Sequence, residues 1–149
     1  MEVNNETDVN AGGSAGLFAY LAWFFALVGL VGSLFLSEVM ELPPCSLCWY
    51  QRIAMYPLVF IIGVGIATGD RSWRKYAWPL VIAGLAIAVY HNLLYYGFIA
   101  EELAPCTEGV PCNAKLLELF GFITIPLMSL AGFIAVAIAM LLDRPAKKL

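Results

Sequence analysis

The sequence predicts an all-α integral membrane protein, a four-helix transmembrane bundle with two short outer loops. Of the 149 residues, 62% are hydrophobic and only 13% are charged, so the polar residues are too few to cover the apolar surface of a water-soluble globule. A helix that crosses a bilayer needs roughly 20 apolar residues, and the chain contains four apolar stretches of about that length. The segments between them are short and leave no room for a separate soluble domain.

The chain divides into a leader, a membrane domain and a tail. Residues 1–16 are polar, acidic and glycine-rich, and we expect a flexible cytoplasmic leader there. Residues 17–142 form the membrane domain, and residues 143–149 a basic cytoplasmic tail. Because the start of the chain is acidic and the first apolar run is long, we expect a retained span and not a cleavable signal peptide.

The apolar runs set the limits of the spans. Pro43 and Pro44 precede the second span, as prolines often precede a helix. Pro57 lies within the second span and Pro126 within the fourth, where we expect a kink and an interruption, respectively. We expect the four spans at residues 17–36, 45–67, 76–98 and 120–142.

The basic residues predict the orientation. Most of them lie between the second and third spans or after the fourth: Arg71, Arg74, Lys75, Arg144, Lys147 and Lys148. By the positive-inside rule both termini are then cytoplasmic. The loops that carry all four cysteines face outward from a bacterial inner membrane, where disulfides persist. The net charge of −3 and the scattered basic residues predict no nucleic-acid surface.

The first cysteine pair forms a CxxC motif at the start of the second span. Cys45 and Cys48 are three residues apart, so on a helix they share a face and are close enough to bridge. Arg52 lies one turn beyond Cys48, and its charge should lower the pKa of the Cys48 thiol. An anchor to lipid headgroups is the alternative for Arg52. We favour the redox role because a reactive thiolate requires a nearby cation.

The second cysteine pair and a histidine complete the candidate site. Cys106 and Cys112 flank a loop whose glycine and prolines turn the chain, so that the two cysteines can meet. A disulfide there closes a small ring, which suits exchange with a visiting protein better than structural stapling. His91 lies inside the third span, level with the outer leaflet, where it can face Arg52. It is a candidate for ligand contact, with a helix-packing hydrogen bond as the alternative.

Several segments carry a family resemblance. The segments PCSLCWYQRI at 44–53 and MYPL at 55–58 closely resemble the DsbB family of bacterial disulfide bond formation proteins. The segments GVPC at 109–112 and FGFITIP at 120–126 are similar to its Gram-positive, short-loop branch of BdbC type. The similarity extends over all four spans and leaves out only the acidic leader.

The resemblance implies a thiol:quinone oxidoreductase that reoxidises a secreted DsbA-like thioredoxin-fold thiol oxidase. Its Gram-positive character favours menaquinone over ubiquinone. Residue by residue, it makes Cys48 the thiolate that engages the quinone, Cys45 its disulfide partner and Arg52 the cation at the quinone. It makes Cys106 the cysteine that joins the partner in a mixed disulfide, and Cys112 the one that attacks Cys45.

Other functions compete with this interpretation. Four cysteines can form a zinc or iron–sulfur cage, although an oxidising outer face works against four reduced thiolates, and we expect no metal. A membrane protein with purely structural disulfides would keep its function after all four cysteines became serine. An epoxide-reductase-like quinone reductase also joins a CxxC span to loop cysteines, but here Gln51 and Arg52 directly follow a CxxC that opens the second span.

Overall fold

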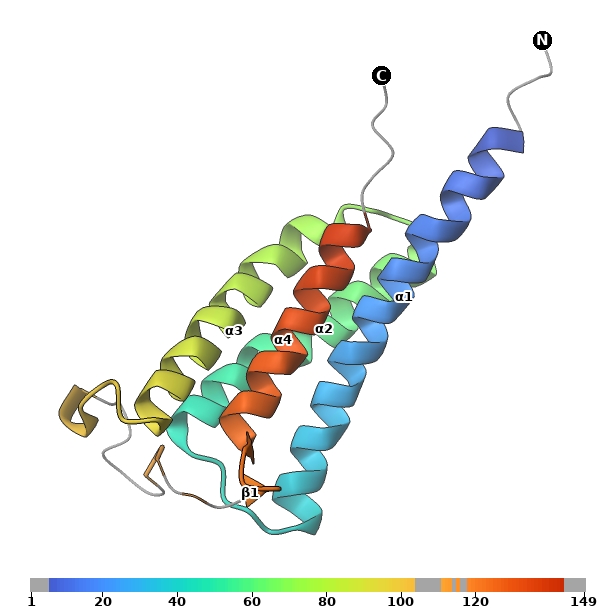
Figure 1. The fold of residues 1–149 in the computed structure, drawn as a ribbon. Coiled ribbons are helices and arrows are strands. Elements are labelled where there is room, and N and C mark those ends of the chain that lie inside the picture. Colours follow the sequence, from blue (N-terminus) through green and yellow to red (C-terminus); the bar gives the residue numbers. More distant parts are fainter. Residues whose placement is uncertain (1–5, 104–110, 114, 116–117, 144–149) are drawn as a thin grey trace.

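The computed structural model describes residues 6–103, 111–113, 115 and 118–143, and four long helices dominate these residues (Figure 1). The helices are α1 (Glu6–Leu34), α2 (Ser46–Thr68), α3 (Trp73–Tyr95) and α4 (Ile125–Leu142). The shorter elements are a π-helix η1 (Phe35–Val39), a 3₁₀ helix η2 (Glu101–Leu103) and two antiparallel strands, β1 (Glu118–Leu119) and β2 (Ile123–Thr124). The predicted all-α membrane bundle is confirmed.

The four helices form a closed ring in which α1 and α3 each pack against both α2 and α4 (Figure 1). One end of the bundle, which we call the basic end, holds the α2–α3 connection with Arg71, Arg74 and Lys75. The opposite end, the cysteine end, holds the start of α2, η2 and the β1–β2 hairpin.

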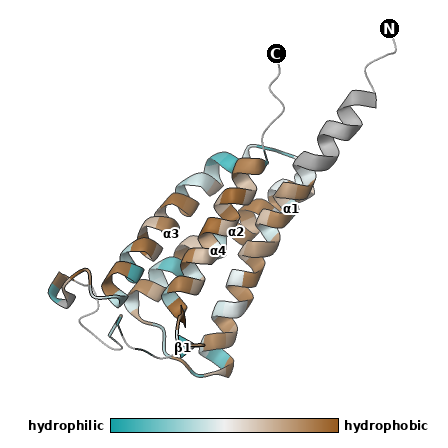
Figure 2. Ribbon diagram, in the orientation of Figure 1, coloured by the Kyte–Doolittle hydropathy of each residue, from teal (hydrophilic) through white to brown (hydrophobic). Residues whose placement is uncertain are grey.

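The outside of the bundle is apolar. Each of the four helices is long and apolar enough to cross a membrane. Figure 2 shows hydrophobic residues along most of their length and hydrophilic ones mainly near the ends. In water so many exposed apolar side chains would be costly, whereas in lipid they face a matching solvent. Large exposed apolar side chains include Phe60, Val64, Ile82, Ile138 and Leu141.

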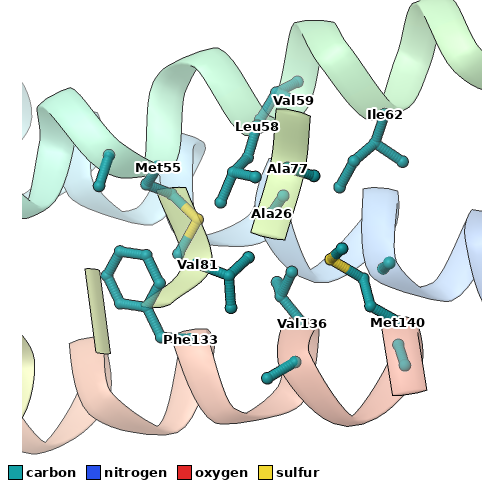
Figure 3. Close-up of a cluster of buried hydrophobic side chains, with 14 of the residues drawn as sticks. Ala26, Met55, Leu58, Val59, Ile62, Ala77, Val81, Phe133, Val136 and Met140 are labelled. Carbon is teal, nitrogen blue, oxygen red and sulfur yellow. The ribbon is translucent and has the colours of Figure 1, made fainter. Parts of the chain in front are cut away.

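The centre of the bundle is filled by close packing between small and large residues. Phe133 of α4 is buried against α3 at Gly84, where a Cβ atom would lie 2.1 Å from the Phe133 ring. Two further small residues, Ala22 and Ala26 of α1, are also fully buried. Figure 3 shows side chains from α2 and α4 facing one another across this core. Small residues allow such close helix approach in membranes, where apolar surface alone does not drive association.

The predicted flexible leader needs correction, because α1 begins at Glu6 and continues without a break into the first span. The apolar span supplies the costly helix nucleus, so each further residue needs only the cheaper propagation step. Residues 1–5 and residues 144–149 of the predicted tail lie outside the described residues.

The predicted interruption of the fourth span by Pro126 is wrong, because α4 begins at Ile125 and not near Phe120. Phe120 and Gly121 have φ values of 56° and 79°, and they turn the chain between β1 and β2. The Thr124 hydroxyl then caps α4 by accepting a hydrogen bond from the Leu127 amide at 3.4 Å. Pro126 therefore lies in the first helical turn, where its missing N–H is not needed.

The second and third spans agree with the prediction to within a few residues. The second begins at Ser46, directly after Cys45, and Pro57 lies inside it. The third begins at Trp73 and not near Tyr76, so Arg74 and Lys75 lie in its first turn. The kink at Pro57 stays a prediction.

Candidate active site

The two thiols of the CxxC motif meet at the start of α2. Cys45 is the N-cap residue, with an extended backbone, and its carbonyl accepts the first helical hydrogen bond from the Trp49 amide at 3.1 Å. Cys48 follows in the first turn, so both thiols lie on one face. Their sulfur atoms are 3.0 Å apart and both thiols are free. The predicted proximity of this pair is confirmed.

Cys45 has surroundings that favour its thiolate. The Cys48 thiol, which hydrogen-bonds to Cys45, is the largest cause that lowers the pKa of Cys45 to about 4; burial opposes it, and a hydrogen bond from His91 lowers the pKa further. Cys45 lies at the N-terminus of a helix, where unpaired amides also favour an anion. In this reduced arrangement the favoured thiolate is Cys45, whereas the sequence led us to expect Cys48.

His91 of α3 connects the two cysteine segments through both of its ring nitrogens. Its Nδ1 lies 3.2 Å from Nε2 of Gln51, and its Nε2 lies 3.1 Å from the backbone oxygen of Cys112 and 3.8 Å from the sulfur of Cys45. A carbonyl oxygen only accepts hydrogen bonds, so Nε2 carries a proton. Nδ1 of a neutral ring then accepts a hydrogen bond from the Gln51 amide group. All of these contacts are buried.

Cys112 thus lies against the CxxC motif. It is buried together with Cys45 in a small cluster that also contains Leu47 and Leu94. Cys112 is disulfide-bonded. Cys106, the partner that we expect for it, lies outside the described residues, so that pairing stays a prediction.

Arg52 joins the site to α1. One of its terminal nitrogens, Nη2, donates a hydrogen bond to the carbonyl of Ser33 at 2.9 Å, and its guanidinium lies 5.3 Å from the centre of the Trp49 ring. Ser33 is close to the point where α1 changes into the π-helix η1, and such a change shifts the backbone hydrogen bonds and exposes carbonyls to other donors. These contacts hold Arg52 at the bundle, although a guanidinium has five N–H groups and can bind further acceptors.

A cavity of about 590 Å³ adjoins the thiols and Arg52. Its volume falls in the range of small-molecule sites, and most of its lining is apolar. Phe25 and Val28 of α1 and Met128 of α4 line the cavity and are also exposed, so it opens to the outside along these helices. An apolar molecule dissolved in the bilayer can therefore enter it. Its polar lining includes Cys45, Cys48, Gln51, Arg52, His91 and Cys112.

The structure thus brings together five of the six predicted site residues around one cavity, with Cys106 undescribed. Sequence reasoning did not assign a role to Gln51, which is buried and orients His91. A signal was present, because an amide side chain within an apolar span and close to a CxxC motif needs a buried polar partner. The predicted meeting of His91 with Arg52 is replaced by contacts between His91 and Gln51, Cys45 and Cys112.

The ligand set required by the four-cysteine metal alternative is not assembled. Cys45, Cys48 and His91 place their ligand atoms within 4.8 Å of one another. However, Cys112 is disulfide-bonded and supplies no thiolate, and the Nε2 proton of His91 is directed at a carbonyl. A three-ligand set would need His91 to give up one of its present hydrogen bonds.

Comparison with known proteins gives a consistent result. The family model described as "Disulfide bond formation protein DsbB" matches residues 15–142. The chain is 44% identical over 131 residues to disulfide bond formation protein C of Bacillus subtilis, covering 88% of this chain and 95% of the relative. It is 44% identical to probable disulfide formation protein C 2 of Bacillus anthracis, with 83% and 88% covered. A probable disulfide formation protein of Metapseudomonas resinovorans is 39% identical, with 83% and 87% covered. No solved structure matches the chain.

Proposed function

The chain belongs to the DsbB family of disulfide bond formation proteins, and from this premise we propose that it is a membrane thiol:quinone oxidoreductase. It reoxidises a secreted DsbA-like thioredoxin-fold thiol oxidase and passes the electrons to a membrane quinone, with menaquinone preferred over ubiquinone. The observation that carries the proposal is a pair of free thiols 3.0 Å apart that lines an apolar cavity open to the bilayer side of α1 and α4.

Electrons enter at the loop cysteines. A thiolate of the reduced partner attacks the Cys106–Cys112 disulfide at Cys106, and the sulfur of Cys112 leaves as a thiolate. The second thiol of the partner then displaces Cys106, so that the partner leaves with a disulfide and the loop keeps two electrons. The position of Cys112 against the CxxC motif supports the next transfer, since its backbone and Cys45 share contacts with Nε2 of His91.

The same two electrons then pass to the CxxC motif. Cys112 attacks Cys45 of an oxidised Cys45–Cys48 pair, and Cys48 leaves as the thiolate. While Cys45 is joined to Cys112, the negative charge rests on Cys48, whose neighbour one turn along the helix is Arg52. Cys106 then attacks Cys112, which re-forms the loop disulfide and releases Cys45, so that both electrons are held by the CxxC pair. This sequence reconciles a Cys45 thiolate in the fully reduced pair with the predicted role of Cys48 at the acceptor.

The cavity residues fit a quinone as the final acceptor. A quinone takes up two electrons and two protons, which balances the oxidation of the partner's dithiol to a disulfide. The apolar wall suits a ring with an isoprenoid tail, and the unused N–H groups of Arg52 can donate to a ring oxygen as its negative charge develops. A DsbA-type oxidase has a potential of about −120 mV, so glutathione at about −200 mV cannot reoxidise it and a stronger electron sink is needed.

The orientation belongs to the same proposal. The basic end faces the cytoplasm together with both termini, and the cysteine end faces outward, as the positive-inside rule requires. The secreted partner then meets the loop cysteines directly, and the quinone reaches the thiols through the lipid.

A thiol oxidation assay with purified protein tests this function. In detergent, the protein should oxidise a reduced thioredoxin-fold dithiol partner only when a menaquinone or ubiquinone analogue is added, with the menaquinone analogue used at lower concentration. Cys112→Ser should abolish turnover, because the relay to Cys45 is lost. The control variant Ser46→Ala, next to Cys45, should retain turnover. Turnover without quinone, or full activity of Cys112→Ser, would contradict the proposal. Metal that co-purifies in proportion to protein would instead favour a site at Cys45, Cys48 and His91.

A further inference from the structure

Tyr56 presents a buried hydroxyl that nothing in the described part of the chain satisfies. Its oxygen is inaccessible to solvent and has no hydrogen-bond partner among the described residues. Tyr56 also lines the cavity beside the thiols. A buried hydroxyl normally has a partner, because burial without one is costly.

The depth of Tyr56 in the span limits what that partner can be. Tyr56 is ten residues beyond Ser46, the first residue of α2, which places its backbone about 15 Å from the helix start. This distance is about half of the ~30 Å hydrocarbon core of a bilayer. Bulk water and lipid headgroups are therefore remote, and the cavity is the place from which an acceptor can reach the hydroxyl.

Tyr56 also follows the proposed chemical groups along one face of α2. Cys48, Arg52 and Tyr56 are spaced four residues apart, so they lie above one another on the helix, and all three line the cavity. Helical side chains lean toward the N-terminus, so the long tyrosine side chain brings its hydroxyl back toward the level of Arg52. A guanidinium and a phenol then flank the same part of an otherwise apolar space.

We propose that the Tyr56 hydroxyl donates a hydrogen bond to a carbonyl oxygen of the quinone, as a second polar anchor beside Arg52. This inference rests on the proposed function and adds a binding residue to it. Two donors from residues on one face of α2 suit a flat ring that carries two carbonyl oxygens, as a quinone does. Tyr56 thereby selects an acceptor with two carbonyls over a merely apolar lipid.

The test compares Tyr56→Phe with Tyr50→Phe, a matched control on the same helix whose ring is about half exposed and does not line the cavity. Tyr56→Phe should raise the quinone KM about three- to tenfold, the range that one hydrogen bond supplies. The rate of disulfide exchange with the reduced partner in a single turnover without quinone should stay unchanged. Tyr50→Phe should match the parent protein in both measurements.

Thermal unfolding in detergent without quinone provides a second measurement. Because Tyr56→Phe removes a hydroxyl that has no partner among the described residues, its Tm should be equal to or above that of the parent, so weaker quinone use cannot be ascribed to unfolding. If the parent protein uses quinone and Tyr56→Phe has the same quinone KM, this inference alone is overturned. A parent protein that shows no quinone-dependent turnover would overturn the proposed function, and this inference with it.

Discussion

Single side chains decide which of the two CxxC thiols carries the negative charge. The proton between the sulfurs of Cys45 and Cys48 can belong to either, since the two atoms are only 3.0 Å apart. Cys45 has the additional contact with His91 and lies at the N-cap, where the amides of the first turn are unpaired. A thiolate on Cys45 is therefore stabilised by a hydrogen bond, an imidazole and a helix terminus together.

The alkylation of Cys45 in the reduced protein should consequently depend little on pH. With a pKa lowered to about 4, the thiolate persists as the pH falls and is lost only near that value. An ordinary thiol with a pKa of about 8.5 would instead lose reactivity roughly tenfold for each pH unit below that value. Site-resolved mass spectrometry after iodoacetamide treatment between about pH 5 and 8 measures the profile.

Two controls accompany the alkylation experiment. Protein unfolded in detergent should show the ordinary thiol profile. Cys48→Ala removes the largest cause of the lowered pKa, so the reactivity of Cys45 in that variant should depend more strongly on pH. A profile for folded, unsubstituted protein that coincides with that of unfolded protein would contradict the assigned thiolate.

The local part of this site was predictable from the sequence, and the part between helices was not. The spacing of Cys45 and Cys48 places both thiols on one helical face in any sequence that begins a helix there. The contact of His91 with Gln51 depends on the rotation of α3 against α2, which no local pattern specifies. For the same reason the sequence did not predict that Arg52 donates to Ser33 of α1.

Helix α1 leaves space for the cavity through its glycines. At Gly29 an added Cβ would contact only the flexible Met55 side chain, and at Gly32 it would meet nothing within 4 Å. Gly84 of α3 behaves differently, because there a Cβ would overlap the Phe133 ring. Small residues thus serve two purposes here, close helix packing at Gly84 and an open volume along α1.

Gly32→Phe should block the cavity without disturbing the fold. The new ring has room at the backbone, and its volume would occupy space that we assign to the quinone. We expect the quinone KM to rise by about tenfold or more, which corresponds to a loss of about 1.4 kcal/mol of binding free energy or more. Steady-state oxidation of the partner over a range of quinone concentrations measures this.

The matched control for Gly32→Phe is Ile138→Phe, which adds a ring of the same size on the exposed face of α4, away from the cavity. This variant should keep the parent KM. Equal KM values for all three proteins would show that the quinone does not use this cavity.

Hydropathy predicted the existence of all four helices, but turn chemistry decided where α4 begins. Residues 120–124 are apolar enough to extend the fourth span, yet they belong to a hairpin turned by Phe120 and Gly121. Hydropathy does not distinguish these states, since an apolar residue suits a span and a packed turn alike. The Thr124 cap and the proline in the next turn are the local signals that mark the true start.

The whole molecule is asymmetric from one end to the other. At the basic end, Arg74 donates hydrogen bonds to the carbonyls of Met140 and Asp143 at the end of α4. Burial raises the pKa of Asp143, while Arg74 and Arg71 act in the opposite direction. Arg74 thus stabilises the C-terminal end of α4, where cations are favoured, and it is also one of the basic residues from which we predict the orientation.

The orientation itself can be tested with a membrane-impermeant maleimide on intact cells. In a background in which all native cysteines are replaced, Lys115→Cys reports on the cysteine end, where the lysine side chain is 70% exposed. Ser72→Cys reports on the basic end, next to Arg71, at a residue that is also exposed. Because basic residues are retained on the cytoplasmic side, Lys115→Cys should react in intact cells and Ser72→Cys only after permeabilisation. Labelling of Ser72→Cys in intact cells would place the basic end outside, and the cysteines would then face a reducing cytosol in which no secreted partner could reach them.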